Sequence, residues 1–221
     1  MTDQGVNKAI PLRQRNAAML RLEIVEAIKE KLRSTSLENI VVKPLCLELG
    51  IAPATFFNHF QGKADVLTYF IQLWTVRLEY ISLQKCRHVN GQAFLDALFS
   101  TLAQDIQEHP RLMLEIISYI AKIENRPDMR SIDRVDMKLA WPELTGIESM
   151  PVRDVGDVFR QHIKEVFKGK KNSQKKELVL FESLVSLFYG YPLAAKVMQN
   201  KDIQAGVERQ LAVIWRGNDL D

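Results

Sequence analysis

The sequence has few cysteines and no long apolar run, and each shortage excludes a class of protein. Two cysteines, Cys46 and Cys86, among 221 residues are too few for the disulfide framework of a small secreted domain, so we expect reduced thiols and a cytoplasmic location. Residues 1–15 lack the apolar core of a signal peptide. The apolar stretch between Glu182 and Lys196 has 13 residues, whereas a membrane helix needs about 20. We therefore expect no membrane partner.

The charge is also close to balanced. The chain has 30 Lys and Arg against 27 Asp and Glu, a formal net charge of +3. This excludes a histone-like polycation, but a local basic cluster could still bind nucleic acid. Hydrophobic residues make up 47% and charged residues 26%, which is typical of a globular protein and not of a disordered one. The length allows one or two domains with a core that needs no disulfide or metal.

The usual signatures of catalysis and of metal or cofactor binding are missing too. The histidines His88, His109 and His162 lie far apart, without metal-ligand spacing to cysteine or carboxylates. We find no P-loop, no G-x-G-x-x-G fingerprint and no G-x-S-x-G elbow. The sequence therefore predicts no metal, no cofactor and no enzyme. An all-helical enzyme stays open as an alternative, and it would need a tight cluster of histidine and carboxylates in a cleft.

The apolar residues that are present follow a helical period along almost the whole chain. Leu20, Ile24, Ile28 and Leu32 recur every four residues and so share one helix face. Similar stripes follow from Val66, Phe94, Leu112, Val155, Leu178 and Ile203 onward. No run alternates apolar and polar residues between hairpin turns. The prediction is an all-α protein, with helix ends that are hard to place between residues 126 and 153.

Residues 36–67 carry the most informative pattern. Two short helical pieces, about 44–49 and 53–60, are separated by Leu49-Gly50-Ile51-Ala52. A short turn containing glycine between two such pieces is typical of a helix-turn-helix. Pro44 and Pro53 each fall in a first helical turn, where the missing N–H group has no intrahelical partner to lose.

The amino-acid sequence of this segment resembles the DNA-binding signature of the TetR family of bacterial transcriptional regulators. The sequence LCLELGIAPATFFNHFQGKADVL matches it through Gly50 and Ile51, Thr55, the His59–Phe60 pair and Lys63. The resemblance is dense over about 25 residues and looser over about 50. It implies an N-terminal three-helix DNA-binding domain followed by a C-terminal helical bundle that binds a ligand and dimerises. It also implies a homodimer that binds a palindromic, double-stranded DNA operator.

The same resemblance implies roles for particular residues. The helix from Pro53 would lie in the major groove, with Asn58 and Thr55 near base edges. DNA contacts are expected from Lys43, Pro53, Ala54, Thr55, Phe57, Asn58, His59 and Lys63. Val41 and Ala52 stand where the family has capping residues, so both helices are expected to lack these caps. Phe57 replaces the family tyrosine and cannot donate to a phosphate.

The C-terminal region carries two further predictions. If its last two helices pair across a two-fold axis, the dimer contacts are Leu178, Phe181, Val185, Phe188, Val207, Leu211 and Ile214. Residues at helical spacing that could line an effector pocket are Phe70, Trp74, Met113, Tyr119, Trp141, Phe159 and Phe188. An effector is expected to be a small and apolar molecule whose binding releases DNA. The open alternative is a regulatory domain that binds a partner protein, which a well-packed interior without a cavity would favour.

The basic excess lies at the N-terminus. Residues 1–33 carry seven Lys or Arg and four Asp or Glu, whereas the recognition segment 53–60 has no formal charge. The predicted division is a flexible basic arm at 1–15, the DNA-binding domain at 16–63 and the regulatory domain at 64–221. Arg13, Arg15 and Arg21 are candidate DNA contacts of the arm and first helix. Neither the operator nor the effector follows from the sequence, nor does the choice between repressor and activator.

Overall fold

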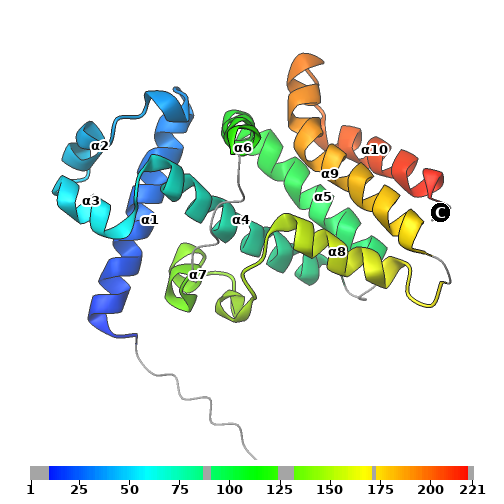
Figure 1. Cartoon of the computed structure of the whole chain (residues 1–221), viewed down its shortest axis with the longest axis horizontal. Coiled ribbons are helices and arrows are strands. Elements are labelled where there is room, and N and C mark those ends of the chain that lie inside the picture. The colour runs from blue at the N-terminus through cyan, green and yellow to red at the C-terminus, as the bar shows by residue number, and fades with distance from the viewer. Residues whose placement is uncertain (1–9, 87–90, 124–131, 171–172, 219–221) are drawn as a thin grey trace, which may run out of the picture.

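In the computed structural model (Figure 1), the described residues, 10–86, 91–123, 132–170 and 173–218, are helical with no strand. Helical periodicity therefore gave the right fold class. The elements are α1 (Leu12–Leu32), η1 (Leu37–Asn39), α2 (Val42–Glu48), α3 (Pro53–His59), α4 (Lys63–Lys85), α5 (Gly91–Glu108), α6 (Pro110–Lys122), α7 (Arg134–Ala140), η2 (Ile147–Ser149), α8 (Val155–Val166), α9 (Gln174–Val197) and α10 (Ile203–Gly217).

The N-terminal unit is built on the apolar face of α1. Ile24, Ile28 and Leu32 are buried there, four residues apart as a helix face requires. Phe56 of α3 and Phe60 are fully buried in the same apolar core. The ring of Phe60 also meets that of Tyr69 on α4 edge to face, with 5.5 Å between centroids. These contacts fix the two short helices, which are too short to be stable alone.

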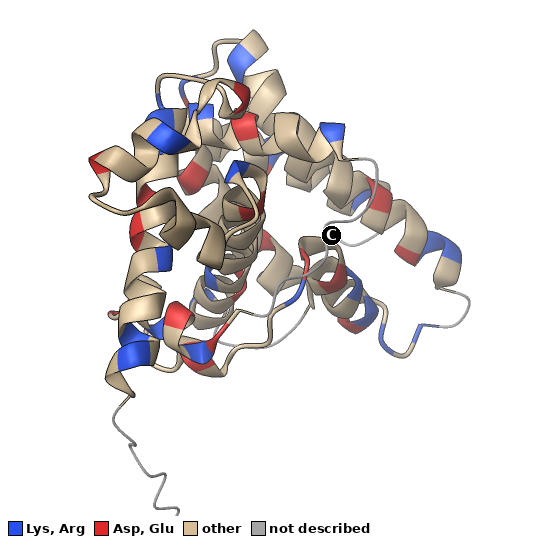
Figure 2. Cartoon of the chain, turned by 60° about the vertical axis from the view of Figure 1, so that its left-hand side comes forward, with Lys and Arg blue, Asp and Glu red and all other residues tan. Residues whose placement is uncertain are grey.

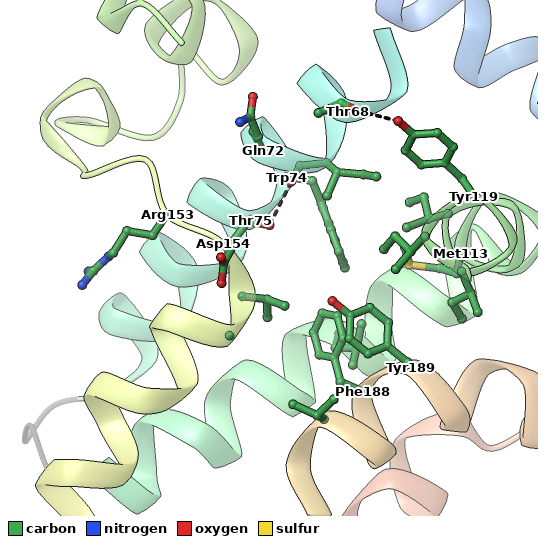
Figure 3. Close-up of a pocket in the computed structure, with 18 of the residues that line it drawn as sticks. Thr68, Gln72, Trp74, Thr75, Met113, Tyr119, Arg153, Asp154, Phe188 and Tyr189 are labelled. Carbon is green, nitrogen blue, oxygen red and sulfur yellow. Dashed lines mark hydrogen bonds between the residues drawn. The ribbon is translucent and has the colours of Figure 1, made fainter. Parts of the chain in front are cut away.

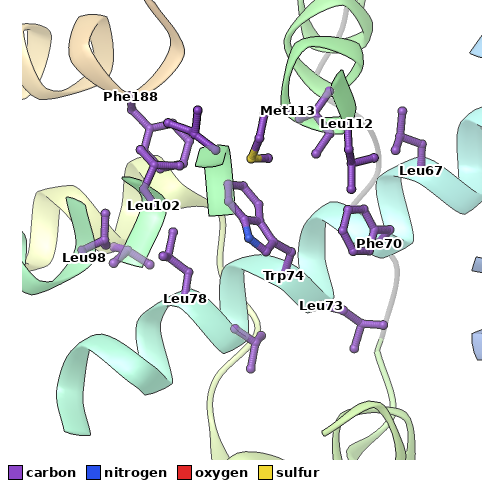
Figure 4. Packing of buried hydrophobic residues seen from close by; sticks show 14 of the residues in the cluster. Leu67, Phe70, Leu73, Trp74, Leu78, Leu98, Leu102, Leu112, Met113 and Phe188 are labelled. Carbon is purple, nitrogen blue, oxygen red and sulfur yellow. The ribbon is translucent and has the colours of Figure 1, made fainter. Parts of the chain in front are cut away.

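The C-terminal bundle is arranged around α5, which contacts α4, α8 and α10. Helix α9 packs on α8, α10 and α6, so the last helices enclose α5 from several sides (Figure 1). The aromatic centre of the bundle includes Phe99, Phe159 and Phe188, whose rings lie 5.6–6.3 Å apart. Figure 4 shows Phe188 near Leu98 and Leu102 in this apolar layer, with Trp74 beyond them.

Helix α9 is longer than the uncharged stretch of the sequence indicated. It runs for 24 residues, and by length and composition alone it could cross a membrane. In the structure its apolar side packs against the other helices of the bundle, burying Leu180, Leu184 and Leu187. Among the described residues it is the single helix with this property.

Two boundaries differ from the predictions. Helix α1 begins at Leu12, so Arg13 and Arg15 lie in its first turn and not in a flexible arm. Residues 1–9 of the predicted arm lie outside the described part of the chain. The difficult stretch 126–153 contains α7 and η2 in its described part, residues 132–153. Asp133 begins α7 with a capping box shared with Asp136, a pair of side chains that stabilises helix starts.

Candidate nucleic-acid interface and ligand pocket

The turn between α2 and α3 closes as the sequence predicts. Gly50 has φ of +66°, a left-handed conformation that is open to glycine without steric cost. The N–H of Ile51 donates to Cys46 O at 3.0 Å, and the N–H of Gly50 donates to Leu47 O at 3.1 Å. This pair of bonds is the Schellman motif, which satisfies the last carbonyl groups of a helix. The turn therefore sets the angle between the two helices.

Both helices begin without a side-chain cap. Val41 precedes α2 and Ala52 precedes α3, and neither donates or accepts a capping hydrogen bond through its side chain. Pro53 occupies the first turn of α3, where its fixed φ favours the helix start. The N–H groups of Thr55 and Phe56 donate to Ala52 O at 2.9 and 3.3 Å, so the first turn of α3 is closed by its backbone.

Helix α3 presents a mostly uncharged face to solvent. Pro53, Ala54, Phe57 and Asn58 are exposed, while Thr55 and His59 are half-buried. The first four share one side of the helix, opposite the buried Phe56. Phe57 has 56% of its surface exposed, which is high for an aromatic side chain without a partner surface. The structure therefore places Asn58 on one open face with Pro53, Ala54 and Phe57, whereas Thr55, the other residue expected near base edges, is half-buried beside it.

The predicted phosphate contacts fall into two groups. Lys43 is exposed at the start of α2, and Arg13 and Arg15 are exposed at the lower end of α1, beside the grey N-terminal trace in Figure 2. Lys63, in contrast, donates from its ammonium to the backbone oxygens of Glu38 at 2.6 Å and Ile40 at 2.8 Å. The geometry therefore gives Lys63 a structural contact inside the N-terminal unit.

The prediction for Arg21 was wrong. Its guanidinium binds Asp136 of α7, with Nη2 at 2.6 Å and Nε at 3.1 Å from the same carboxylate oxygen. The side chain of Asp136 is only 2% exposed. An arginine held in this way joins α1 to the C-terminal region and is not a contact of a DNA-binding arm.

A pocket of about 420 Å³ lies between α4, α6, α8 and α9, and it is partly open to solvent. Its wall is mainly aliphatic and aromatic, with Trp74, Met113, Tyr119 and Phe188 around the interior in Figure 3. The volume and the apolar lining are typical of sites for small organic molecules. A well-packed interior, which would have favoured a partner protein, is therefore not what the structure shows.

Polar groups at the pocket are few, and they are largely engaged with one another. Thr68 and Tyr119 share a hydrogen bond of 2.7 Å between hydroxyl oxygens, and Thr75 donates to Ile71 O at 2.8 Å. Trp74 donates its indole N–H to Asp105 at 2.7 Å. These bonds hold the side chains in fixed orientations, leaving a wall to which apolar groups bind best.

The ion pair of Arg153 and Glu79, at one end of the pocket, points away from the pocket interior. Arg153 lines the pocket, but Figure 3 shows its side chain directed away from Trp74 and Phe188. Its guanidinium binds Glu79 of α4, whose side chain is 2% exposed, and also Gln161. Burial raises the pKa of Glu79, while the positive charge of Arg153 lowers it. The pair anchors the residues just before α8 to α4.

Four of the predicted pocket residues line the pocket and three do not. Trp74, Met113, Tyr119 and Phe188 belong to its wall. Phe159 is wholly buried behind Phe188 in the bundle core, and Phe70 is buried next to Lys29 of α1, whose ammonium lies 5.1 Å from the ring centroid. Trp141 packs against the core between α7 and η2. Helical spacing indicated that these three side chains are buried, but it could not show whether each one faces the pocket or another part of the core.

The residues predicted to form the dimer interface also fall into two groups, buried and exposed. Phe188, Val207 and Leu211 are buried within the single chain, and Phe181 and Val185 line the pocket, so these assignments were wrong. Leu178 is exposed and Ile214 is half-buried. The apolar side chains left on the open face of α9 are instead Val179, Leu193 and Val197. The reason is that α5 covers the apolar side of α10, while the apolar side of α9 packs on α8, α10 and α6.

The sequence analysis missed Thr68, Gln72 and Thr75, three polar residues on the buried side of α4. They are nearly inaccessible and all three line the pocket. Their spacing of four and three residues puts them on one helix face. Polar side chains at such positions in a buried stripe are a signal that could have indicated the pocket wall.

No group of three or more His, Cys, Asp or Glu side chains that could hold a metal occurs within the residues described by the structure. Over the described residues, the chain is all-helical, with an N-terminal helix-turn-helix and a C-terminal pocket. Comparison with solved structures agrees with this description. A TetR transcriptional regulator from Rhodococcus sp. RHA1 superposes with a TM-score of 0.54 and 14% sequence identity, over 90% of this chain and 96% of that one.

The chain therefore has the fold of a TetR transcriptional regulator. No family model matches the sequence. No curated protein sequence matches it either. The structural likeness thus supports the resemblance that residues 45–67 carry, although the sequences have diverged widely.

Proposed function

We propose that the protein is a cytoplasmic transcriptional repressor that binds a palindromic operator as a homodimer and is released by a small apolar molecule. The observation that carries this proposal is the open face of α3, where Pro53, Ala54, Phe57 and Asn58 are exposed beside a capless helix start. A helix of this kind docks in the major groove, where Asn58 can bond adenine through its amide.

The uncharged face of α3 shapes how the operator is read. Phe57 and Ala54 can contact thymine methyl groups, whereas base-edge hydrogen bonds come mainly from Asn58 and Thr55. Phosphate binding then falls to Lys43, Arg13 and Arg15, which are exposed around this face. We therefore expect an operator rich in A·T pairs at the positions that face α3.

The first experiment selects an operator from random double-stranded DNA and measures binding by fluorescence anisotropy. Asn58→Ala should weaken binding about tenfold or more, with an unchanged unfolding midpoint. Lys201→Ala, at an exposed site before α10, is the control and should bind like the wild type. If no sequence is enriched, or if Asn58→Ala binds equally well, the proposed DNA interface is wrong.

The pocket supports a small ligand over a partner protein or a substrate. Its lining is dominated by Trp74, Tyr119, Phe181, Phe188 and neighbouring aliphatic side chains. Its two arginines form ion pairs with residues outside the lining, Arg153 with Glu79 and Arg160 with Asp157. A ligand that fits is an uncharged, partly aromatic molecule. Because the ligand can shift the DNA equilibrium only by its differential affinity for two states, it must bind the DNA-free form more tightly.

The probe N-phenyl-1-naphthylamine, an uncharged aromatic fluorophore, tests the pocket directly. Its fluorescence should rise on binding, and Val185→Trp should abolish the rise because Val185 lines the pocket. Lys164→Trp places the same side chain on the exposed side of α8 and should leave binding unchanged. Equal binding by both variants would show that the probe binds elsewhere.

A further inference from the structure

The residues between the pocket and the DNA-binding unit form a continuous folded connection, here called the strap, residues 132–154. At one end the strap begins with Asp133 and Asp136 of α7, which lie against α1. At the other end it finishes with Arg153 and Asp154, which line the pocket. Figure 1 shows α7 between the N-terminal unit and α8. The strap thus touches both sites that the proposed function needs.

At the α1 end, two carboxylates serve α1 and α7 at the same time. Asp136 accepts from Arg21 through one oxygen at 2.6 and 3.1 Å, and through the other from its own helix start, the N–H of Asp133, at 3.1 Å. Asp133 accepts from the N–H of Val135 at 3.3 Å and from Gln14 at 2.7 Å. The same carboxylates cap α7 and hold α1, so the start of α7 is fixed relative to α1.

The middle of the strap is folded and is hydrogen-bonded to α4. Ile147 is completely buried, and Tyr80 of α4 donates to Thr145 O at 2.7 Å. Successive backbone bonds join Leu144 to Trp141 and Ile147 to Leu144. A segment closed by such bonds moves as a unit, whereas an open loop would absorb a displacement locally.

At the pocket end, Arg153 binds the buried Glu79. The next residue, Asp154, accepts the N–H of Asp157 at 2.8 Å and so caps α8. Val155 and Gly156, the first residues of α8, also belong to the pocket wall. A ligand that displaces the start of α8 must therefore move the end of the strap.

We propose that the strap transmits ligand occupancy to α1, with Arg21 and Asp136 as the positioning pair that grips the DNA-binding unit. This inference rests on the proposed function, since it needs a ligand in the pocket. Arg21 and Asp136 act through the orientation of α1, on which α2 and α3 are packed. Two other connections exist: α4 lines the pocket and packs on α1, and in α6 Glu115 accepts the N–H of Leu37 at 3.2 Å. The test separates the strap from both.

The test measures hydrogen–deuterium exchange of the full chain with and without N-phenyl-1-naphthylamine. In the wild type the probe should change exchange at residues 12–32 by about fivefold or more, in line with usual coupling between sites. In the double variant Arg21→Met/Asp136→Asn the probe should bind within about twofold of wild type and still change exchange at residues 153–156. The change in α1 should be lost.

The choice of variants guards against simple unfolding. Asp136→Asn keeps an oxygen that can cap α7 but strands Arg21, and Arg21→Met strands Asp136, so each single variant should be less stable than the double variant. Arg33→Met removes the arginine at the C-cap of α1, which within the described residues forms an ion pair with Glu30 of the same helix, and should respond like the wild type.

The possible failures are distinguishable. If the probe does not bind the wild type, the pocket is no ligand site, and the proposed function and the strap fall together. If it binds but α1 does not respond, or if α1 responds equally in the double variant, the strap is wrong while the ligand pocket stands. In the latter case, loss of the response in Glu115→Met, which removes the acceptor for Leu37, would assign the coupling to α6, and a retained response would assign it to α4, which also packs on α1.

Discussion

Lys63 lies at the start of α4 with its ammonium 2.8 Å from the carbonyl oxygen of Ile40, a residue that precedes α2. A second bond, to Glu38 O, holds the same short segment. The lysine of the helix-turn-helix signature thus connects the segment that follows α3 to the segment that precedes α2. Its place in the motif has a structural explanation that is independent of DNA.

This geometry predicts that Lys63→Met lowers the free energy of unfolding by about 1–3 kcal/mol, because two backbone oxygens lose a charged donor. Urea unfolding followed by circular dichroism measures the change. Lys43→Met is the matched control: Lys43 is exposed, so its replacement should change stability by less than about 0.5 kcal/mol but weaken operator binding. The reverse pattern, with Lys63→Met stable and defective in DNA binding, would restore the phosphate role.

Phe57→Tyr should tighten operator binding about fivefold. Phe57 is 56% exposed on the open face of α3, and a hydroxyl there can donate to a phosphate, a bond of about 1 kcal/mol. Anisotropy titration of the selected operator measures the effect. Phe60→Tyr provides the contrast, since Phe60 is buried and a hydroxyl at that site should destabilise the fold. An unchanged affinity for Phe57→Tyr would place the DNA backbone out of its reach.

Because of His162, we predict that the folded protein loses stability in acid. It is 2% exposed and its ring stacks on Phe94 at 3.4 Å between centroids. Burial first, and then the charge of Arg153, lower its pKa to about 4, against the opposing charge of Glu165. In the unfolded chain its pKa is about 6.5, so the unfolded state gains a proton first as the pH falls.

The contribution of His162 is therefore fully present above pH 6.5 and is lost between pH 6.5 and 4, by about 2–3 kcal/mol in all. Urea unfolding at pH 7.5, 6.0 and 5.0 measures this loss. His162→Gln removes the titrating group at similar size and should lose less stability over the same range. If both proteins lose the same amount, other groups cause the acid dependence.

Leu193→Arg should convert a dimer into a monomer. Val179, Ser186, Gly190, Leu193 and Val197 share the open face of α9, with the three larger side chains 44–73% exposed. An apolar helix face with small residues between larger ones allows a second helix to approach closely. Analytical ultracentrifugation checks the mass. Leu47→Arg, at a still more exposed leucine on α2, should leave the mass unchanged, and a wild-type monomer would exclude this interface.

The sequence predicted the fold because its strongest signals are local. Stripes such as Ile24 and Ile28 indicate a helix whatever lies opposite, and the Gly50 turn depends on backbone geometry within a few residues. The helix-turn-helix was predictable for the same reason. These are the features that the structure reproduces most closely.

Contacts between distant segments were not predictable in the same way. Arg21 and Asp136 are 115 positions apart, and no local pattern pairs them. An apolar stripe shows which side of a helix is buried but not against which helix, so Val207 and Leu211 were assigned to a partner chain although α5 covers them. The pocket shares this origin, because it is a gap left where four helices meet.

The central place of α5 has a consequence for how the chain is made. Its apolar sides are covered by α4 and α8 and finally by α10, whose Trp215 donates to Asp96 of α5 at 2.8 Å. On the ribosome, α5 emerges before α10, so part of its surface stays uncovered until α10 has been made. We expect nascent chains that stop before α10 to be held by chaperones or degraded.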